Sequence, residues 1–113
     1  MQGPPDGTFI PVATLADLDD RGRAVVSVDG TRVALVRVEG HLHALEDTCP
    51  HRGGPLSEGD LDGHVLHCPL HAWPFDVRTG RCSRQPDARV RIYEVRVEGE
   101  HILVAASGSF PAR

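Results

Sequence analysis

The stretch that decides the fold is residues 49–80, CPHRGGPLSEGDLDGHVLHCPLHAWPFDVRTG. It begins with Cys49-Pro50-His51 and later contains Cys68-Pro69-Leu70-His71, so each motif pairs one thiol with one imidazole. In an extended loop, residues two apart point the same way at about 6–7 Å. Two such loops facing each other present two sulfurs on one side and two ring nitrogens on the other. This donor set predicts a two-metal centre, with both cysteines on one metal and both histidines on the other.

The composition of this stretch predicts loops rather than long strands. Prolines 50, 55, 69 and 74 and several glycines interrupt it, and proline and glycine at this density are incompatible with long regular strands. Asp62-Gly63 indicates one short hairpin inside it. We therefore expect a loop-rich cluster-binding subdomain at about residues 47–80, stabilised by bound metal.

The flanking sequence predicts antiparallel strands. Asp29-Gly30 and Glu39-Gly40 separate three β-rich runs, which predicts a three-stranded meander over residues 23–46. A second hairpin is predicted around Glu98-Gly99, with Tyr93, Val95 and Val97 on one face of its first strand and Ile102 and Val104 alternating in its second. Residues 15–18 allow one turn of helix at most. The fold class is all-β, an antiparallel β-sandwich.

The spacing of the two motifs resembles the Rieske iron–sulfur family. The pattern is Cys49-x-His51-x4-Leu56-x2-Gly59, then Cys68-Pro69-x-His71-x3-Phe75-x3-Thr79-Gly80. The resemblance implies one [2Fe–2S] cluster held by Cys49, His51, Cys68 and His71, with the histidines on the outer iron. Small soluble bacterial Rieske ferredoxins and the small subunit of assimilatory nitrite reductase are the most similar members.

The function implied by this resemblance is one-electron transfer between proteins, without catalysis by the chain itself. We expect a ferredoxin component that passes electrons from a flavin reductase to a terminal oxygenase. The alternative is the small iron–sulfur subunit of an assimilatory nitrite reductase, bound to a large reductase subunit. A structural zinc module of the Cys₂His₂ type is the alternative from another class, although zinc sites usually pair cysteine with cysteine.

Four positions depart from patterns known in the family. Rieske proteins of cytochrome complexes join the two loops by a disulfide at the positions of Gly54 and Leu70, so that bridge is impossible here. Glycine commonly follows the second histidine, where this chain has Ala72. A neutral oxidised centre gives Rieske proteins potentials of roughly −150 to +300 mV. Rieske proteins of cytochrome complexes also have a serine hydroxyl two residues after the second histidine, where this chain has Trp73. Because donors to the cluster are fewer here, we expect a potential at the low end of this range.

Other candidate residues have ordinary structural interpretations. Cys82 has no partner motif and is expected to pack as a small apolar side chain. His67 directly precedes a ligand cysteine and is a candidate for contact with the ligands. An apolar collar over the outer iron is predicted from Leu70, Trp73 and Pro74.

The bulk composition fits one soluble domain spanning residues 1–113. The formal net charge of −4 argues against a nucleic-acid partner, because such proteins carry a basic surplus. No run of about 20 apolar residues is present, so no membrane segment is expected. No signal peptide is visible and the three cysteines are an odd number, which favours the cytoplasm.

Overall fold

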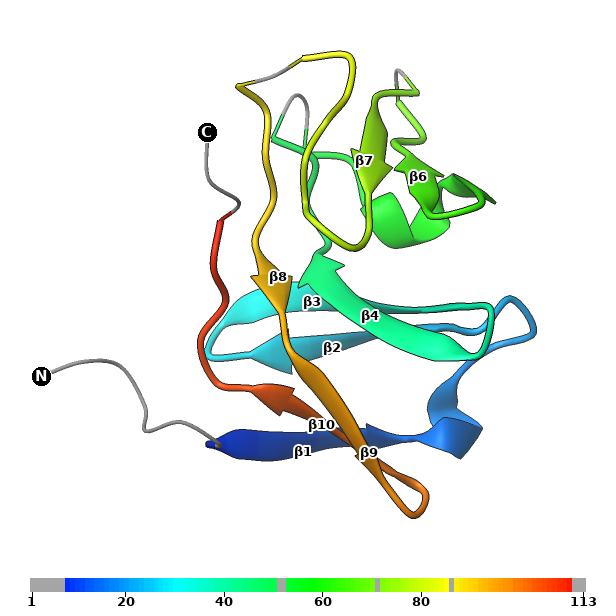
Figure 1. Ribbon diagram of the computed structural model, residues 1–113, viewed down its shortest axis with the longest axis vertical. Helices are drawn as coiled ribbons and strands as arrows, with labels where there is room; N and C mark the ends of the chain where they lie inside the picture. Colours follow the sequence, from blue (N-terminus) through cyan, green and yellow to red (C-terminus); the bar gives the residue numbers. More distant parts are fainter. Residues whose placement is uncertain (1–7, 51–52, 71, 86, 111–113) are drawn as a thin grey trace, which may run out of the picture.

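The computed structural model describes residues 8–50, 53–70, 72–85 and 87–110. The strands of these residues form three antiparallel sheets (Figure 1). No helix in the described ranges is long and apolar enough to cross a membrane. The elements in chain order are β1 (Phe9–Thr14), η1 (Leu15–Asp17, a 3-10 turn), β2 (Arg23–Val28), β3 (Thr31–Val38), β4 (His41–Glu46), η2 (Leu56–Glu58, a 3-10 turn), β5 (Asp60–Asp62), β6 (Val65–His67), β7 (Pro74–Asp76), β8 (Ile92–Tyr93), β9 (Val95–Glu98) and β10 (His101–Ala105).

Two of the sheets form a sandwich, and the third is carried at one end of it. The order β2-β3-β4-β8 defines what we call the scaffold sheet, and β1-β10-β9 forms the opposing sheet. The chain between β4 and β8, residues 47–91, is called the insert, and it contains the sheet β5-β6-β7 at the top of Figure 1. The predicted all-β fold, an antiparallel sandwich with a loop-rich insert, is therefore confirmed.

The meander predicted over residues 23–46 is present as β2, β3 and β4. The turn residues Asp29 and Gly30 have φ of 52° and 82°, and Glu39 and Gly40 have φ of 53° and 84°. Two-residue hairpin turns of type I′ require positive φ at both positions, which Asp-Gly supplies at little steric cost. Each X-Gly pair thus places the following strand in register with the one before it.

The hairpin inside the insert turns one residue later than the Asp62-Gly63 pair predicts. Asp62 pairs with Val65, so Gly63 and His64 form the turn. Positive φ occurs at Gly63, the first of these two residues, where it is 62°. A turn with one positive φ at its first central position is of type II′, which needs glycine there rather than second.

The β9–β10 hairpin is confirmed, with Val95 packed on the sandwich core and buried Tyr93 placed in β8, but Val97 departs from the predicted buried face. Ile102 and Val104 are fully buried in the sandwich core, whereas Val97 is 45% exposed. Val97 pairs with Ile102 near the turn, and β9 is the edge strand of its sheet. Figure 1 shows this turn extending away from β4, so the scaffold sheet does not cover the end of β9.

The strand β3 contributes to two separate cores. Val33 and Leu35 pack between the two sheets of the sandwich. Ala34, Val36 and Val38 point the other way and pack against the insert. Successive side chains of a strand alternate between the two faces of a sheet, so an unbroken apolar run serves both cores. The insert is thereby joined to the scaffold through a continuous apolar layer.

Two histidines meet where the scaffold sheet contacts the insert. The rings of His43 (β4) and His64 (β5–β6 turn) have centroids 5.8 Å apart and lie nearly perpendicular. His43 Nε2 is buried, with no hydrogen-bond partner among the described residues. Burial lowers the pKa of His43 below its ordinary 6.5, and the charges of His64, His41 and Arg78 lower it further, opposed by Asp76.

This histidine pair predicts a loss of stability in mild acid. Because the pKa of His43 is lower in the folded protein than in the unfolded chain, unfolding takes up protons as the pH falls through about 6.5. The contribution of His43 to the free energy of unfolding is therefore fully present above that pH and decreases below it. We expect the melting temperature of His43→Gln to fall less than that of the wild type between about pH 7.5 and pH 5.

The control variant is His101→Gln, which changes an exposed histidine on β10 whose charge is not among those that shift the pKa of His43. It should keep the pH dependence of the wild type. Equal pH dependence of the melting temperature in His43→Gln and the wild type would show that His43 does not take up a proton on unfolding.

Candidate metal centre

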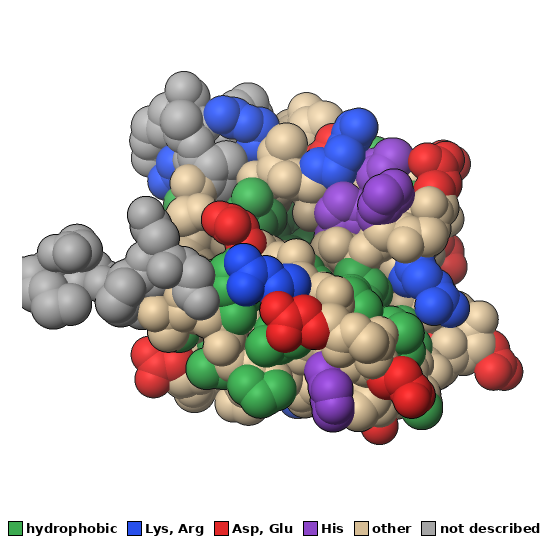
Figure 2. Space-filling view, turned by 60° about the horizontal axis from the view of Figure 1, so that its bottom comes forward, with side chains coloured by type: hydrophobic (Ala, Val, Ile, Leu, Met, Phe, Trp, Pro, Cys, Tyr) green, Lys and Arg blue, Asp and Glu red, His purple; other side chains and the backbone are tan. Residues whose placement is uncertain are grey.

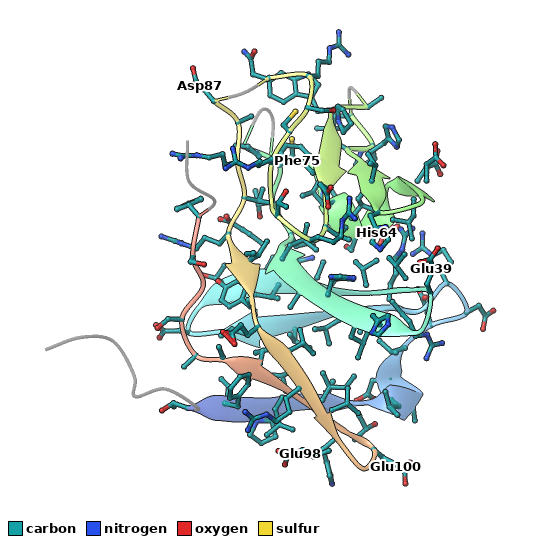
Figure 3. All side chains as sticks on the ribbon, in the orientation of Figure 1. Glu39, His64, Phe75, Asp87, Glu98 and Glu100 are labelled. Atoms are coloured by element: carbon teal, nitrogen blue, oxygen red, sulfur yellow. The ribbon has the colours of Figure 1, made fainter. Side chains whose placement is uncertain are left out.

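Both cysteines predicted as ligands lie in the apolar core of the insert. Cys49 follows β4 and Cys68 follows β6, and each is only 1% exposed. They share one buried cluster with side chains from the scaffold sheet and the insert, among them Leu45 and Phe75. Figure 3 labels Phe75 within this upper part of the molecule. Two strands far apart in the sequence therefore bring two thiols into the same dry environment.

The first loop, residues 49–54, is closed at its base by backbone hydrogen bonds. The Cys49 amide donates to the Gly54 carbonyl at 2.9 Å, and the Gly53 amide donates to the Cys49 carbonyl at 2.7 Å. Below them, Thr48 and Pro55 form an antiparallel bridge. These contacts hold the backbone on both sides of the loop, so the position of Cys49 is determined by the strand that precedes it.

The second loop, residues 68–73, repeats the same pattern. The Cys68 amide donates to the Trp73 carbonyl at 2.9 Å, and the Ala72 amide donates to the Cys68 carbonyl at 2.7 Å. The fifth residue of each loop has positive φ, 75° at Gly53 and 59° at Ala72. Glycine adopts this conformation without strain and alanine does not. The backbone of Ala72 is therefore strained, whereas the equivalent residue of the first loop is Gly53, which is not.

The two loops touch each other at Gly54. A Cβ atom built on Gly54 would lie 3.0 Å from Leu70 Cγ and 3.2 Å from Cys68 Sγ. The Cys68 thiol thus packs directly against the backbone of the first loop. Gly54 and Leu70 stand at the positions where Rieske proteins of cytochrome complexes carry a disulfide, and here an apolar contact joins the loops instead.

The structure describes two of the four predicted ligands. His51 and His71 lie outside the described residues. Within the described residues no group of three or more histidine, cysteine or acidic side chains forms a metal site. The donor chemistry nevertheless fits an iron–sulfur centre, because Cys49 and Cys68 are buried thiols on apposed loops and thiolates are the usual ligands of such clusters.

A buried arginine with no recognisable signal in the sequence supports this region. Arg23, on β2, is 6% exposed, and its Nη1 donates to the carbonyls of Ser57 at 2.8 Å and Gly59 at 2.6 Å. It joins the edge of the scaffold sheet to the η2 turn that follows the first loop. A lone arginine in a strand pattern carries no signal for such a contact, because its partners are backbone carbonyls far away in the chain.

The remaining candidates divide between core and surface. Cys82 is 3% exposed and belongs to the same apolar cluster as the ligand cysteines, in agreement with packing as a small apolar residue. Of the predicted apolar collar, Leu70 is 51% exposed, whereas Trp73 is partly buried and packs on the core. His67 lies 3.4 Å from the Asp60 carbonyl through its Nδ1.

An open groove lies beside the second loop. Its volume is about 450 Å³, and Leu70 forms part of its wall. The other lining residues are Glu58, Gly59, Asp60, His67, Cys68, Pro69 and Ala72. The region around Cys68 therefore has an exposed apolar side chain and two carboxylate residues at the protein surface.

The family profile of the Rieske [2Fe-2S] domain matches residues 8–106. The chain belongs to the Rieske [2Fe–2S] family. As a Rieske domain it has one [2Fe–2S] cluster. The alternative interpretation of the sequence, a structural zinc module, is therefore wrong.

Two ferredoxin components match this chain over almost their whole length. The ferredoxin component of the naphthalene 1,2-dioxygenase system of Pseudomonas aeruginosa is 33% identical, covering 88% of this chain and 96% of the relative. The ferredoxin subunit of biphenyl dioxygenase from Pseudomonas sp. strain KKS102 is 36% identical, covering 86% of this chain and 91% of the relative.

Solved structures agree with this assignment. The ferredoxin of carbazole 1,9a-dioxygenase from Nocardioides aromaticivorans IC177 has 36% identity and a TM-score of 0.78, covering 88% of this chain and 98% of that one. A chain from a complex of reduced oxygenase and oxidised ferredoxin in carbazole 1,9a-dioxygenase also has a TM-score of 0.78, with 33% identity and coverage of 90% and 96%. A nitrite reductase NADPH small subunit, at 24% identity and a TM-score of 0.77, covering 86% and 97%, shares the fold alone.

The contact between the loops of the Rieske centre predicts that Gly54→Ala is damaging. Its methyl group would crowd Cys68 Sγ and Leu70, and overpacking a close contact costs about 1–3 kcal/mol. We expect lower iron content per chain and a lower free energy of unfolding. The control for crowding is Gly53→Ala, whose Cβ meets only Thr48 Cγ2 at 4.0 Å; its φ of 75° should lower the free energy of unfolding, but the iron content should stay at the wild-type level. If Gly54→Ala binds as much iron as the wild type, the loops do not need this close approach.

The strained backbone of the second loop predicts that Ala72→Gly is stabilising. Relief of the left-handed conformation is worth about 1–2 kcal/mol, and the greater freedom of glycine in the unfolded chain removes about 0.4–1 kcal/mol of that gain. We expect a net increase in the free energy of unfolding of up to about 1.6 kcal/mol, measured by denaturation of the oxidised holoprotein. Gly53→Ala should change it in the opposite direction. A destabilised Ala72→Gly would contradict the assignment of strain.

Proposed function

We propose that this Rieske protein is a one-electron carrier, the ferredoxin component that passes electrons from a reductase to a terminal oxygenase. The observation that carries the proposal is the pair of buried, apposed cysteine loops in a Rieske domain that makes up residues 8–106. Its relatives of matching length are ferredoxin components of dioxygenase systems. An electron carrier of this kind needs a held cofactor and an accessible surface beside it.

The proposed ligands are Cys49 and Cys68 for the inner iron and His51 and His71 for the outer iron. When bound, the [2Fe–2S] cluster accepts and releases single electrons. The chain supplies two buried thiols, holds each cysteine loop closed by its own hydrogen bonds and excludes water from the cysteine side. The prolines after each cysteine stiffen both loops.

The proposed electron exit is the surface around the second loop. Leu70 is exposed beside the groove, so a partner protein can pack against it without unfolding the insert. Protein partners that exchange electrons commonly form small, transient interfaces. The expected partners are a flavin reductase and a terminal oxygenase.

The cytoplasm is the proposed location. Cys68 and Cys82 are buried thiols outside any disulfide. A reducing compartment keeps such thiols available to iron, whereas secreted proteins of this size usually rely on disulfides.

The test is spectroscopy and metal analysis of anaerobically purified protein. We expect about two iron atoms and two labile sulfides per chain, negligible zinc and a Rieske-type EPR signal after dithionite reduction. A redox titration should take up about one electron per chain. A colourless protein with one zinc per chain would refute the electron-transfer function.

Matched variants test the ligands. Cys68→Ala should lose the cluster, whereas Cys82→Ala should keep it, because both cysteines are buried in the same core and only Cys68 is a proposed ligand. His71→Ala and His67→Ala form the corresponding histidine pair. Equal iron content in Cys68→Ala and Cys82→Ala would refute the proposed ligand set.

Binding to partners separates the two functions of the family considered above. A mobile ferredoxin should bind its reductase weakly and more weakly still as salt is added, because such encounters depend on surface charge. Stable co-purification with a large reductase subunit would instead assign the chain to a nitrite reductase.

A further inference from the structure

One fully buried carboxylate lies directly before the first cysteine loop. Asp47 is 0% exposed and stands two residues before Cys49. One oxygen of its carboxylate accepts the Ser57 amide at 2.7 Å, and the other accepts Arg32 Nη2 at 3.1 Å. Sequence reasoning did not select Asp47, although its position two residues before a ligand was available as a signal.

The backbone of Asp47 also links β3, which contains Arg32, to the η2 turn that follows the first loop. Its amide donates to the Arg32 carbonyl at 2.9 Å, and its carbonyl accepts the Leu56 amide at 2.7 Å. The contacts of Asp47 with Leu56 and Ser57 lie just below the Thr48–Pro55 bridge. Asp47 therefore joins the scaffold sheet to both sides of the first cysteine loop.

The two charges of this ion pair are unequally exposed to solvent. The side chain of Arg32 is 64% exposed, whereas that of Asp47 is wholly buried. Water screens the guanidinium far more than the carboxylate, so the negative charge acts more strongly on buried neighbours. The Cα atoms of Asp47 and Cys49 are separated by at most about 7.6 Å, twice the spacing of consecutive Cα atoms.

We propose that Asp47 is a positioning residue of the Rieske centre and that its buried charge lowers the reduction potential, with Arg32 offsetting part of this effect. One-electron reduction adds a negative charge to the site. A fixed negative charge nearby opposes that addition, and a nearby positive charge favours it. The proposal rests on the ligand set given under Proposed function.

The experiment measures the midpoint potential of purified holoprotein by mediated redox titration. Asp47→Asn keeps an oxygen that accepts the Ser57 amide but removes the charge, so we expect a positive shift. Arg32→Gln removes the cation and leaves the buried carboxylate, so we expect a negative shift. The double variant should lie between the two single variants. Opposite signs are the signature, because loosening the loop would not move the potential in opposite directions.

Exposed charges of the opposing sheet provide the control. Glu98→Gln and Arg96→Gln change the net charge of the protein by the same amounts, and their 3.7 Å ion pair is exposed. Figure 3 places Glu98 at the end of the molecule opposite Phe75 of the insert. These two variants should leave the potential unchanged.

The positioning role has its own readout. Asp47→Ala removes both acceptor oxygens and should bind less iron per chain, and Asp47→Asn should restore the wild-type content. No shift in Asp47→Asn, shifts of one sign in Asp47→Asn and Arg32→Gln, or full iron content in Asp47→Ala would overturn the proposal. Absence of iron from the wild type would instead refute the proposed function.

Discussion

The apposition of the two cysteine loops is the constraint on which the rest of the structure depends. The loops meet without an intervening side chain at Gly54, where a Cβ atom would crowd both Leu70 and Cys68 Sγ. Each loop is closed by the same pair of backbone hydrogen bonds. Two similar loops in contact can bind one cofactor between them only if their bases are held in fixed relative positions, and the sheets supply those positions.

The scaffold sheet holds the bases of the two loops in place through β3 and through two polar contacts. β3 packs into the sandwich core with one face and into the core of the insert with the other. Arg23 and Asp47 then bind the η2 turn to the scaffold sheet from two sides. Figure 2, turned so that the bottom of Figure 1 comes forward, shows histidine side chains gathered beside arginine on one flank of the molecule. The insert is thus joined to the sandwich by a continuous apolar layer and by the hydrogen bonds of Arg23 and Asp47.

Much of the architecture was predictable because it depends on local chemistry. A two-residue type I′ turn needs positive φ at both residues, and Asp29-Gly30 and Glu39-Gly40 have it. The meander could therefore be predicted from these two pairs. The spacing of Cys49 and Cys68 within their motifs indicated the family before any fold was known. Turn register was less predictable, because a Gly-containing pair such as Asp62-Gly63 permits glycine at either central position. Val97 was misplaced because strand alternation does not reveal how far the opposing sheet extends.

The sequence by itself supplied the proposed iron ligands, and it determined where turns connect the strands of the meander and that the protein is all-β, since each of these depends on neighbouring residues. Tertiary structure alone decided the contacts between distant ones. It placed Gly54 against Cys68, buried Asp47 beside the loop that carries Cys49, and seated Arg23 under the carbonyls of η2. Such pairings depend on how separate strands pack. In the buried interior an added methyl group or a single charge changes the free energy strongly, because the interior is densely packed and weakly screened, whereas solvent weakens the same effect at the surface.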